Sequence, residues 1–473
     1  MIEVKVPLGV GPDVAPGAVP RGWPVGGPRP VPGGVCVGGL GDPGTVLLSG
    51  PGAASGPETW AGHQTRWGPL PPLDGAQVLS VARAAGLDGR GGGGFPLARK
   101  LETALATGGR PLLFVNASES EPSSAKDAAL CRWRPHLVLD GAALVATALG
   151  TTEVSVHLHD GAGPPVDGMR WAMGDRHRAG HRVDWTLALG PGGYVSGEAS
   201  AVAGFALDGD ARPRFSMVPL ATEGPSGRPT VVVNAETAAQ LGVLARLGPA
   251  DWAGLGAGGS PGPRLLTLTG AVDRPGQVVE LTGPGTVGDV LARAGGLQAP
   301  PAAVLVGGFA GTWVRGEEAW QAPWERSALA CVGAGPGCGL LGVLPHGSCG
   351  LVETARVVAY LAGESAGQCG TCVAGLPRLA AALASLADGT LRRRALRRVD
   401  VLADELLGSG ACAHPDGVVR LVRSALSAFD DDVVRHLAGD PCHGADHPPV
   451  FAVPAPGRRA GIAVRRVDVA AAS

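Results

Sequence analysis

Between residues 69 and 247, short apolar runs alternate with segments whose apolar residues recur every three or four positions. A run of four to eight apolar or alternating residues is typical of a strand, and the wider spacing is typical of an amphipathic helix. The pattern predicts strands at 111–115, 153–159, 183–189 and 230–233 and helices at 76–85, 135–149, 200–207 and 235–247. Strands that alternate with helices indicate an α/β domain with a largely parallel sheet.

The segment before this domain follows no such pattern. Residues 1–68 are rich in Gly and Pro and lack sustained periodicity, which predicts an extended or partly disordered arm. Order is expected to begin near Leu70.

Two further regions follow the α/β domain. Residues 248–332 predict a small α+β module, with strands at 264–269, 277–281 and 303–306 and a helix at 287–294. Residues 333–439 predict helices at 351–361, 376–386, 391–407 and 418–428, and their short connections indicate an antiparallel bundle. Residues 440–473 return to Pro, Arg and Ala and predict a tail.

Composition restricts the class of protein. Of the 473 residues, 45% are hydrophobic and 17% are charged, so the chain can bury a sizeable core, and the net charge of −2 argues against nucleic-acid binding. No apolar run approaches the ~20 residues of a membrane span, and the N-terminus lacks a signal-peptide pattern. Nine cysteines are too few for a disulfide framework. We therefore expect a cytoplasmic protein in which a close cysteine pair serves metal or redox chemistry.

A glycine-rich loop carries the first candidate chemistry. Residues 89–96 read Gly-Arg-Gly-Gly-Gly-Gly-Phe-Pro, and Lys100 follows. Glycines let backbone N–H groups approach a phosphate closely, and Arg90 and Lys100 could neutralise its charge. In a chain with 78 glycines, however, such a run also arises by chance.

Three polar segments follow predicted strands or enter predicted helices. They are Asn116 to Pro122, Tyr194 to Glu198 and Val233 to Thr237. Ligands of α/β sheets lie beyond the carboxyl ends of the strands, where these segments are expected. A polar surface turn is the less favoured alternative for the first segment. N-capping by Ser196 or Asn234 explains each of the other two as well as ligand contact does when it is taken alone.

The cysteines suggest a metal site. Cys369 and Cys372 form a C-x-x-C pair, and Cys412 lies at the end of a neighbouring predicted helix. Thiolates suit an iron–sulfur cluster or zinc, while a dithiol redox pair is the competing interpretation.

These motifs occur together, and in this order, in one family. Over about residues 75–437, the chain resembles the NADH-binding flavoprotein subunit of respiratory complex I, the bacterial F subunit, and the related diaphorase subunits of soluble hydrogenases and formate dehydrogenases. The resemblance implies a Rossmann-like FMN/NADH domain at 69–247, a ubiquitin-like β-grasp (SLBB) domain at 248–332 and a four-helix iron–sulfur bundle at 333–439.

The resemblance also implies cofactors and their residues. FMN and NADH share one cavity, and a [4Fe–4S] cluster lies at the bundle. Glu119 and Glu198 are implied to orient flavin and nicotinamide, which is the role closest to catalysis. The implied cofactor-binding residues are Gly89, Arg90, Gly91, Gly92, Phe95, Lys100, Asn116, Ser118, Glu119, Glu121, Tyr194, Gly197, Glu198, Asn234 and Thr237, and the implied iron ligands are Cys369, Cys372 and Cys412.

The chain departs from the family at several positions. Ala366 occupies the position of the first cluster ligand, which leaves a [3Fe–4S] cluster, a [4Fe–4S] cluster with another fourth ligand such as His414 or Cys349, or no cluster. Ser118 stands where the family has Asp, Ala199 where it has Glu, and Val233 where it has Asn. Yet both asparagines of the chain, two of its three lysines and one of its two tyrosines fall within the flavin-site motifs.

The resulting expectation is a component that passes electrons from NADH through FMN to an iron–sulfur centre or a partner carrier. Ferredoxin, a thioredoxin-like iron–sulfur subunit and a membrane cytochrome are the expected partners, within a hetero-complex that is peripheral to the membrane. A diaphorase without a cluster and a degenerate, non-catalytic scaffold subunit are the alternatives.

Overall fold

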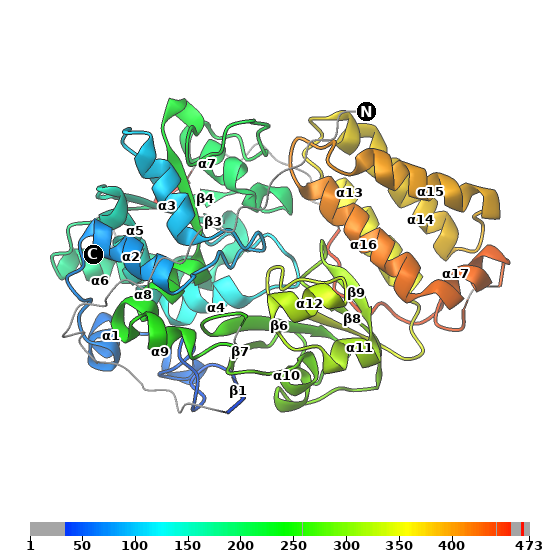
Figure 1. Cartoon of the computed structure of the whole chain (residues 1–473), viewed down its shortest axis with the longest axis horizontal. Helices are drawn as coiled ribbons and strands as arrows, with labels where there is room; N and C mark the ends of the chain where they lie inside the picture. Colours follow the sequence, from blue (N-terminus) through cyan, green and yellow to red (C-terminus); the bar gives the residue numbers. More distant parts are fainter. Residues whose placement is uncertain (1–33, 258, 441, 456–464, 468–473) are drawn as a thin grey trace, which may run out of the picture.

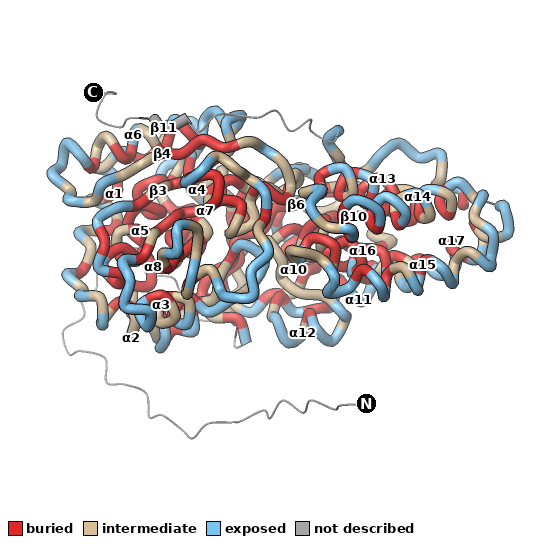
Figure 2. The backbone as a smooth tube through the Cα atoms, turned by 90° about the horizontal axis from the view of Figure 1, so that it is seen from above, coloured by how far each residue is buried: buried red, intermediate tan, exposed pale blue. Residues whose placement is uncertain are grey.

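The structure, a computed structural model, describes residues 34–257, 259–440, 442–455 and 465–467. Figure 1 shows three regions: an α/β unit around a five-stranded sheet, a second unit around a six-stranded sheet, and a helical region that contains α13 to α17. Figure 2 shows that buried positions concentrate in the strands and in helices such as α5 and α8. Within the described ranges, no helix combines the length and the apolar character that crossing a bilayer requires.

The five-stranded sheet has the order β11-β4-β3-β2-β5. Strands β2 (Leu112–Asn116), β3 (Glu153–His159), β4 (Asp184–Gly190) and β5 (Thr230–Asn234) run parallel, as predicted, and β11 (Arg465–Val467) pairs antiparallel with β4 at the edge. β11 lies in the segment that was expected to be only a tail.

Helices cover both faces of this sheet because successive strand residues point to opposite sides. Leu113 and Val231 face a large core that includes α5 (Pro135–Leu149) and α8 (Ala235–Leu247), whereas Phe114 and Val232 face α7 (Ala199–Asp208). The other helices of this unit are α2 (Gly75–Ala84), α3 (Leu97–Ala106), α4 (Lys126–Trp133) and α6 (Pro164–Arg178).

The N-terminal segment is ordered well before Leu70, so the predicted arm is wrong for residues 34–67, while residues 1–33 lie outside the described part. The segment contains β1 (Cys36–Gly38) and α1 (Trp60–Trp67). Between them, the apolar residues 46–48 are almost completely buried, and their three N–H groups donate to the carboxylate of Glu280 at 2.9 to 3.1 Å. Burial raises the pKa of Glu280 to about 7.

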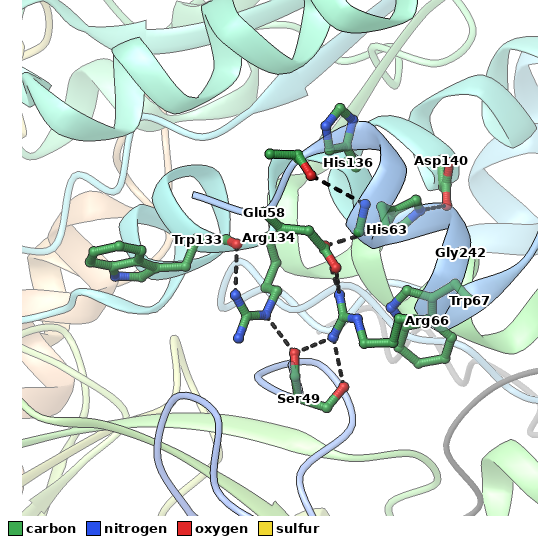
Figure 3. A network of polar contacts seen from close by, with 12 residues as sticks. Ser49, Glu58, His63, Arg66, Trp67, Trp133, Arg134, His136, Asp140 and Gly242 are labelled. Atoms are coloured by element: carbon green, nitrogen blue, oxygen red, sulfur yellow. Dashed lines mark hydrogen bonds and ion pairs between the residues drawn. The ribbon is translucent and has the colours of Figure 1, made fainter. Parts of the chain in front are cut away.

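A buried ion network attaches α1 to the helices of the α/β unit (Figure 3). His63 on α1 lies between Glu58 and Asp140, at 3.2 and 2.7 Å, and Asp140 also contacts Arg246 at 2.7 Å and Arg176 at 2.5 Å. All five side chains are nearly inaccessible to solvent.

The six-stranded sheet has the order β1-β7-β6-β10-β8-β9. Its members beyond β1 are β6 (Arg264–Gly270), β7 (Val278–Thr282), β8 (Pro301–Val306), β9 (Thr312–Arg315) and β10 (Leu340–Pro345). Helices α9 (Pro249–Ala253), α10 (Val287–Arg293), α11 (Gly316–Gln321) and α12 (Arg326–Cys331) accompany it. β10 is fully buried and lies beyond residue 332, so the sheet extends past the expected end of this module.

The helical region contains α13 (Gly350–Gly363), α14 (Leu376–Ala387), α15 (Arg393–Leu406), α16 (His414–Ala428) and α17 (Asp430–Leu437). A π-helical turn, Thr371–Gly375, leads into α14. The described residues after α17 return toward the six-stranded sheet, where Phe451 is buried against Trp313 with ring centroids 5.7 Å apart.

Candidate functional site

A cavity of about 570 Å³ lies where the three regions meet. Its walls come from the carboxyl ends of β2 and β5, from the glycine-rich loop before α3, from the turn before α7, from turns of the six-stranded sheet and from the start of α16. This volume falls within the range of about 300–1,000 Å³ that is typical of small-molecule and cofactor sites. A larger hollow of about 680 Å³ between β9 and α16 contains none of the predicted residues.

The cavity brings together most of the residues predicted from the sequence. The predicted cofactor-binding residues that line it are Gly89, Gly91, Gly92, Phe95, Lys100, Asn116, Ser118, Glu119, Glu121, Tyr194, Gly197, Glu198, Asn234 and Thr237. Cys412 also lines it, whereas Arg90, Cys369 and Cys372 do not.

The predicted role of the Arg90 side chain at the phosphate is wrong. Arg90 is buried, its guanidinium donates to the Pro261 carbonyl at 2.9 Å, and it lies 3.4 Å from the Asp88 carboxylate. Its backbone N–H donates to Thr237 Oγ1 at 2.8 Å. Arg90 therefore holds the base of the glycine loop rather than reaching into the cavity.

The glycine loop itself is open toward the cavity. Gly92 has a φ of +105°, and a Cβ added at Gly93 would meet no atom within 4 Å. Among the described residues, the N–H groups of 91–93 find no hydrogen-bond acceptor. Lys100 lies in the first turn of α3, where its Nζ donates to the Val232 carbonyl at 2.8 Å and burial lowers its pKa. Free N–H groups beside a cation suit a phosphate.

The loop after β2 is locked to the turn before α7. Asn116 Nδ2 donates to the Gly197 carbonyl at 2.8 Å, and Asn116 Oδ1 accepts from Ser118 Oγ at 2.6 Å. A Cβ at Gly197 would lie 2.4 Å from Ser120 Oγ, so only glycine fits there. These contacts position the polar edge of the cavity.

The two carboxylates expected to orient the cofactors are mainly helix caps. Both oxygens of Glu119 accept hydrogen bonds, from the N–H groups of Asp127 and Ala128 at the start of α4 and from Ser124 Oγ. Burial and the nearby Asp127 raise the pKa of Glu119 to about 6. The Glu119 carboxylate thus caps the start of α4 while the residue lines the cavity.

Glu198 caps α7 through one oxygen, Oε2, which accepts from the N–H groups of Ser200 and Ala201 at 2.8 and 3.2 Å. Glu198 is thus the N-cap that was expected of Ser196, whose hydroxyl donates to the Gly193 carbonyl instead. The other carboxylate oxygen of Glu198 forms no hydrogen bond with the described residues. Burial is the main cause that raises the pKa of Cys412, and the negative charge of Glu198 raises it further. Glu198 therefore lies between the cavity and the cysteines.

Asn234 is the N-cap of α8, one of the two roles expected from its sequence position, and it also lines the cavity. Its Oδ1 caps α8 through the N–H groups of Glu236 and Thr237, and its Nδ2 donates to Asp127 at 2.6 Å. Asp127 in turn contacts Lys126 at 2.8 Å, a buried lysine that also pairs with Glu236 at 3.0 Å. These carboxylates raise the pKa of Lys126 despite its burial.

Glu121 has the most perturbed carboxyl group of the predicted site. Its Oε2 accepts from the Phe309 N–H at 2.8 Å and from the Tyr194 hydroxyl at 3.4 Å, while the buried Oε1 has no partner among the described residues. Burial raises the pKa of Glu121 to about 7, against the lowering effect of the Phe309 N–H. An unpartnered, buried acceptor in the cavity wall is suited to receive a hydrogen bond from a ligand.

Replacement of Glu121 by Gln is expected to stabilise the ligand-free protein at about pH 8 and to have little effect at about pH 5. A buried carboxyl whose pKa rises from 4.5 to about 7 gives stability that is fully present below pH 4.5 and is lost as the pH rises through 7. The difference in the free energy of unfolding between the variant and the wild type at about pH 8 is at most about 3 kcal/mol. Chemical denaturation at the two pH values measures it.

The matched control for this variant is Glu317→Gln, which removes an exposed carboxylate on α11. Glu280 titrates in the same direction, but it is unchanged in both proteins and cancels in the comparison. If the free energy of unfolding of Glu121→Gln and of the wild type changed with pH in parallel, Glu121 would not be the carboxyl group with the raised pKa.

Sequence reasoning missed the wall supplied by the six-stranded sheet and by α16. The missed residues of this wall are Gly307, Ala310, Gly337, Cys338, Gly417 and Arg420. Gly307 and Gly337 have positive φ and approach each other so closely that a Cβ at Gly337 would lie 2.1 Å from the Gly307 carbonyl. The glycines that follow predicted strands were the only signal that could have found them.

The predicted iron ligands converge at the edge of the cavity. Cys369 lies near Cys372, and the charges of Cys369 and Cys412 add to burial in raising the pKa of Cys372 to about 11. Burial opposes ionisation of Cys369, but the N–H groups of Ala411 and Cys372 lower its pKa overall. Three neighbouring thiols fit three of the ligands of an iron–sulfur cluster.

The two suggested substitutes for the missing fourth ligand lie elsewhere or have other partners. His414 Nε2 contacts the Leu361 carbonyl at 2.8 Å. Cys349 groups with His436 and Cys442 instead of with the three cluster cysteines. Cys349 is therefore not placed to act as the fourth cluster ligand, and His414 Nε2 already contacts a backbone carbonyl.

The site residues also fit the two nucleotides that the resemblance implies. The free N–H groups of the glycine loop and Lys100 suit the phosphate of FMN. Phe95 is 51% exposed at the rim of the cavity, where an aromatic ring can stack on a nicotinamide. Glu121 Oε1 is a further acceptor in the cavity wall.

Comparisons with known proteins match two parts of the chain to families. Residues 82–242 match the family model described as the Nuo51 FMN-binding domain, and residues 353–436 match that of the NADH-ubiquinone oxidoreductase-F iron-sulfur binding region.

Individual relatives extend over most of the chain. The F subunit of the NADH-quinone oxidoreductase of Mycobacterium tuberculosis (strain H37Rv) is 28% identical over 392 residues, covering 79% of this chain and 86% of the relative. The second of two such F subunits in Rhizobium meliloti is 27% identical over 380 residues, covering 77% and 90%. A solved NAD⁺-reducing [NiFe]-hydrogenase in the H₂-reduced state matches with a TM-score of 0.70 and 29% identity, over 80% of this chain and 65% of the hydrogenase chain.

Proposed function

We propose that this chain, which is related to the F subunits of NADH-quinone oxidoreductase through both their FMN-binding and their iron–sulfur regions, oxidises NADH and passes the electrons on through FMN and an iron–sulfur centre. One observation carries the proposal: a single cavity gathers the glycine loop, the Asn116 loop, the turn ending at Glu198 and Asn234, and has Cys412 in its wall.

The proposed domains follow the family. An FMN/NADH-binding Rossmann-like domain, expected at 69–247, is followed by an SLBB β-grasp domain, expected at 248–332, and an iron–sulfur helical bundle, expected at 333–439. Because β10 belongs to the six-stranded sheet, the boundary between the last two is better placed after Pro345. The N-terminal segment is better assigned to the first two domains from residue 34 onward, because β1 joins the six-stranded sheet and α1 packs on α5.

FMN, when bound, accepts a hydride from NADH and releases the electrons singly. The chain supplies position and exclusion of water. The N–H groups of Gly91 to Gly93 and the Lys100 cation would hold the phosphate of FMN, and Asn116 and Ser118 would hold the polar edge of the flavin. Phe95 and Glu121 would help to seat the nicotinamide nucleotide.

Glu198 and Cys412 connect the cavity with the cluster site. Cys412 both lines the cavity and lies near Cys369 and Cys372, so these residues would hold a cluster beside the flavin cavity. Three thiolates support a [3Fe–4S] cluster, or a [4Fe–4S] cluster whose fourth iron takes a ligand other than cysteine.

We assign the protein to a multi-subunit, peripheral assembly, in keeping with the names of its relatives. The electrons would go to a ferredoxin, a thioredoxin-like iron–sulfur subunit or a membrane cytochrome, and a cytoplasmic location is proposed.

The experiment that tests the proposal is the visible spectrum of anaerobically purified protein before and after addition of NADH. Flavin absorption that bleaches with NADH, above a broad residual shoulder from the cluster, is the expected result. A protein that stays colourless after incubation with FMN would instead support the non-catalytic scaffold, which the substitutions at Ser118, Ala199 and Ala366 favour.

Cys372→Ser is expected to separate the two redox centres. It removes one of only three thiol ligands, so iron and acid-labile sulfide should fall at least tenfold while NADH still bleaches the flavin. Cys331→Ser, at an exposed position on α12, is the matched control and should keep the wild-type iron content. Unchanged iron in Cys372→Ser would show that the cluster is held elsewhere.

A further inference from the structure

Two thiols and an imidazole meet inside the helical region, away from the cavity. Cys349 precedes α13, His436 lies in the last turn of α17, and Cys442 follows α17. One ligating atom from each lies within 4.8 Å of the other two. Cys349 is 2% exposed, His436 0% and Cys442 8%. Cys349 lies 87 residues before His436, so the sequence spacing does not bring all three together.

The imidazole of His436 is held in the orientation and tautomer that a metal requires. Its Nδ1 faces two carbonyl oxygens at the end of α14, those of Leu386 and Ala387, at 3.2 and 2.8 Å. Carbonyl oxygens only accept hydrogen bonds, so Nδ1 carries the proton and Nε2 keeps its lone pair. A metal-binding histidine is typically oriented by such a bond from its other nitrogen.

His436 Nε2 lies near both sulfur atoms. Cys349 Sγ lies 3.6 Å from His436 Nε2. A tetrahedral zinc ion with Zn–S of about 2.3 Å and Zn–N of about 2.0–2.1 Å separates its sulfur and nitrogen ligands by about 3.6 Å. The Cys442 N–H also donates to Nε2, at 3.1 Å, so metal binding requires this one loop amide to turn away.

We propose that Cys349, His436 and Cys442 bind a structural zinc ion that is separate from the iron–sulfur centre. Two thiolates and one imidazole are a zinc-type donor set, and water takes the fourth tetrahedral position. α14 has 12 residues and separates the two sites. Cys372 lies just before its start and the His436 partners lie at its end, about 18 Å apart along the helix axis.

The proposed ion fixes the segment that crosses from the helical region to the six-stranded sheet. After Cys442, this segment places the N–H groups of Val450 and Phe451 on the Glu353 carboxylate of α13, at 2.9 and 3.4 Å. Phe451 then fills the space over Gly342 on β10, where a Cβ would lie 2.8 Å from its ring. Zinc at Cys442 thus anchors one end of a connection whose other end is packed on the sheet.

The test is metal analysis of the full-length protein purified with reductant from zinc-supplemented cells. About one zinc per chain is expected in the wild type, and at least tenfold less in Cys349→Ser and Cys442→Ser, with FMN and iron contents unchanged. His443→Ala, which removes the exposed neighbour of Cys442, and Cys331→Ser are the controls that should keep zinc. Cys372→Ser should lose iron and keep zinc.

If the variants do not fold, a measurement on the wild-type protein alone tests whether zinc is bound by sulfur and nitrogen ligands. X-ray absorption at the zinc edge is unaffected by flavin and iron, and it should show a mixed shell of sulfur at about 2.3 Å and nitrogen or oxygen at about 2.0 Å. Wild-type protein without zinc, a zinc shell without sulfur, or a Cys349–Cys442 disulfide in peptide mapping would each overturn the proposal. None of these readouts depends on NADH oxidation.

Discussion

Asp140→Ala is expected to lower the free energy of unfolding by about 3–5 kcal/mol, because it leaves buried guanidinium groups without their counter-charge. Asp140 is the hub of the buried network: it contacts His63 on α1, Arg176 on α6 and Arg246 on α8. Figure 3 shows Asp140 beside His63. Burial alone would raise the pKa of Asp140, but Arg176, His63 and Arg246 hold it well below its ordinary value. Arg176 is 0% and Arg246 2% exposed, so water cannot replace the lost carboxylate.

Chemical denaturation followed by tryptophan fluorescence measures this loss, since Trp60 and Trp67 lie beside the network. Asp167→Ala is the matched control. Asp167 also pairs with an arginine, Arg170 at 3.1 Å, but its side chain is 71% exposed. An exposed pair contributes at most about 1 kcal/mol. Equal effects of the two substitutions would show that the buried network is not what holds α1.

The same network explains why the N-terminal segment escaped prediction. Regularly spaced apolar residues reveal a helix or strand that buries one of its faces. Residues 34–67 contain few helices or strands of this type. Their order comes from distant partners: Glu280, more than 230 residues further along the chain, binds the N–H groups of Val46 to Leu48. A Gly- and Pro-rich segment can therefore be ordered when a distant charged side chain accepts hydrogen bonds from its backbone N–H groups.

The α/β region, by contrast, could be predicted closely. Strands such as β2 and β5 and helices such as α5 and α8 bury continuous apolar faces, and that is the property that a sequence pattern reveals. Motif order also identified the segments of the cavity wall, because polar residues at the ends of parallel strands meet at one edge of the sheet.

Side-chain direction within those segments could not be predicted. Glu119 has a φ of +43°, an unusual conformation that turns its carboxylate toward the start of α4. Arg90 faces Asp88 and the Pro261 carbonyl, which belong to other parts of the chain. The sequence shows that charged residues gather near a site, but helix capping and long-range contacts decide which of them face the ligand.

Gly92→Ala is expected to weaken FMN binding by ten- to a hundredfold. Gly92 lines the cavity with a φ of +105°, a conformation that costs an alanine about 1–3 kcal/mol. The loop is exposed, so it can relieve this strain by changing shape rather than by unfolding the domain. The change would move the N–H groups of Gly91 to Gly93 away from the phosphate position, and about 1.4 kcal/mol of lost interaction is a tenfold loss of affinity. Titration of the flavin-free protein with FMN, followed by flavin fluorescence, measures the dissociation constant.

Gly150→Ala separates the loss of a ligand contact from backbone strain. Gly150 also has a positive φ, +65°, but it ends α5 away from the cavity, and a Cβ there meets no atom within 4 Å. Both variants should therefore lower the melting temperature slightly, and only Gly92→Ala should release flavin. If both bound FMN with wild-type affinity, the glycine loop would not be the phosphate site. The Lys100 ammonium and the start of α3 would then have to hold the phosphate without it.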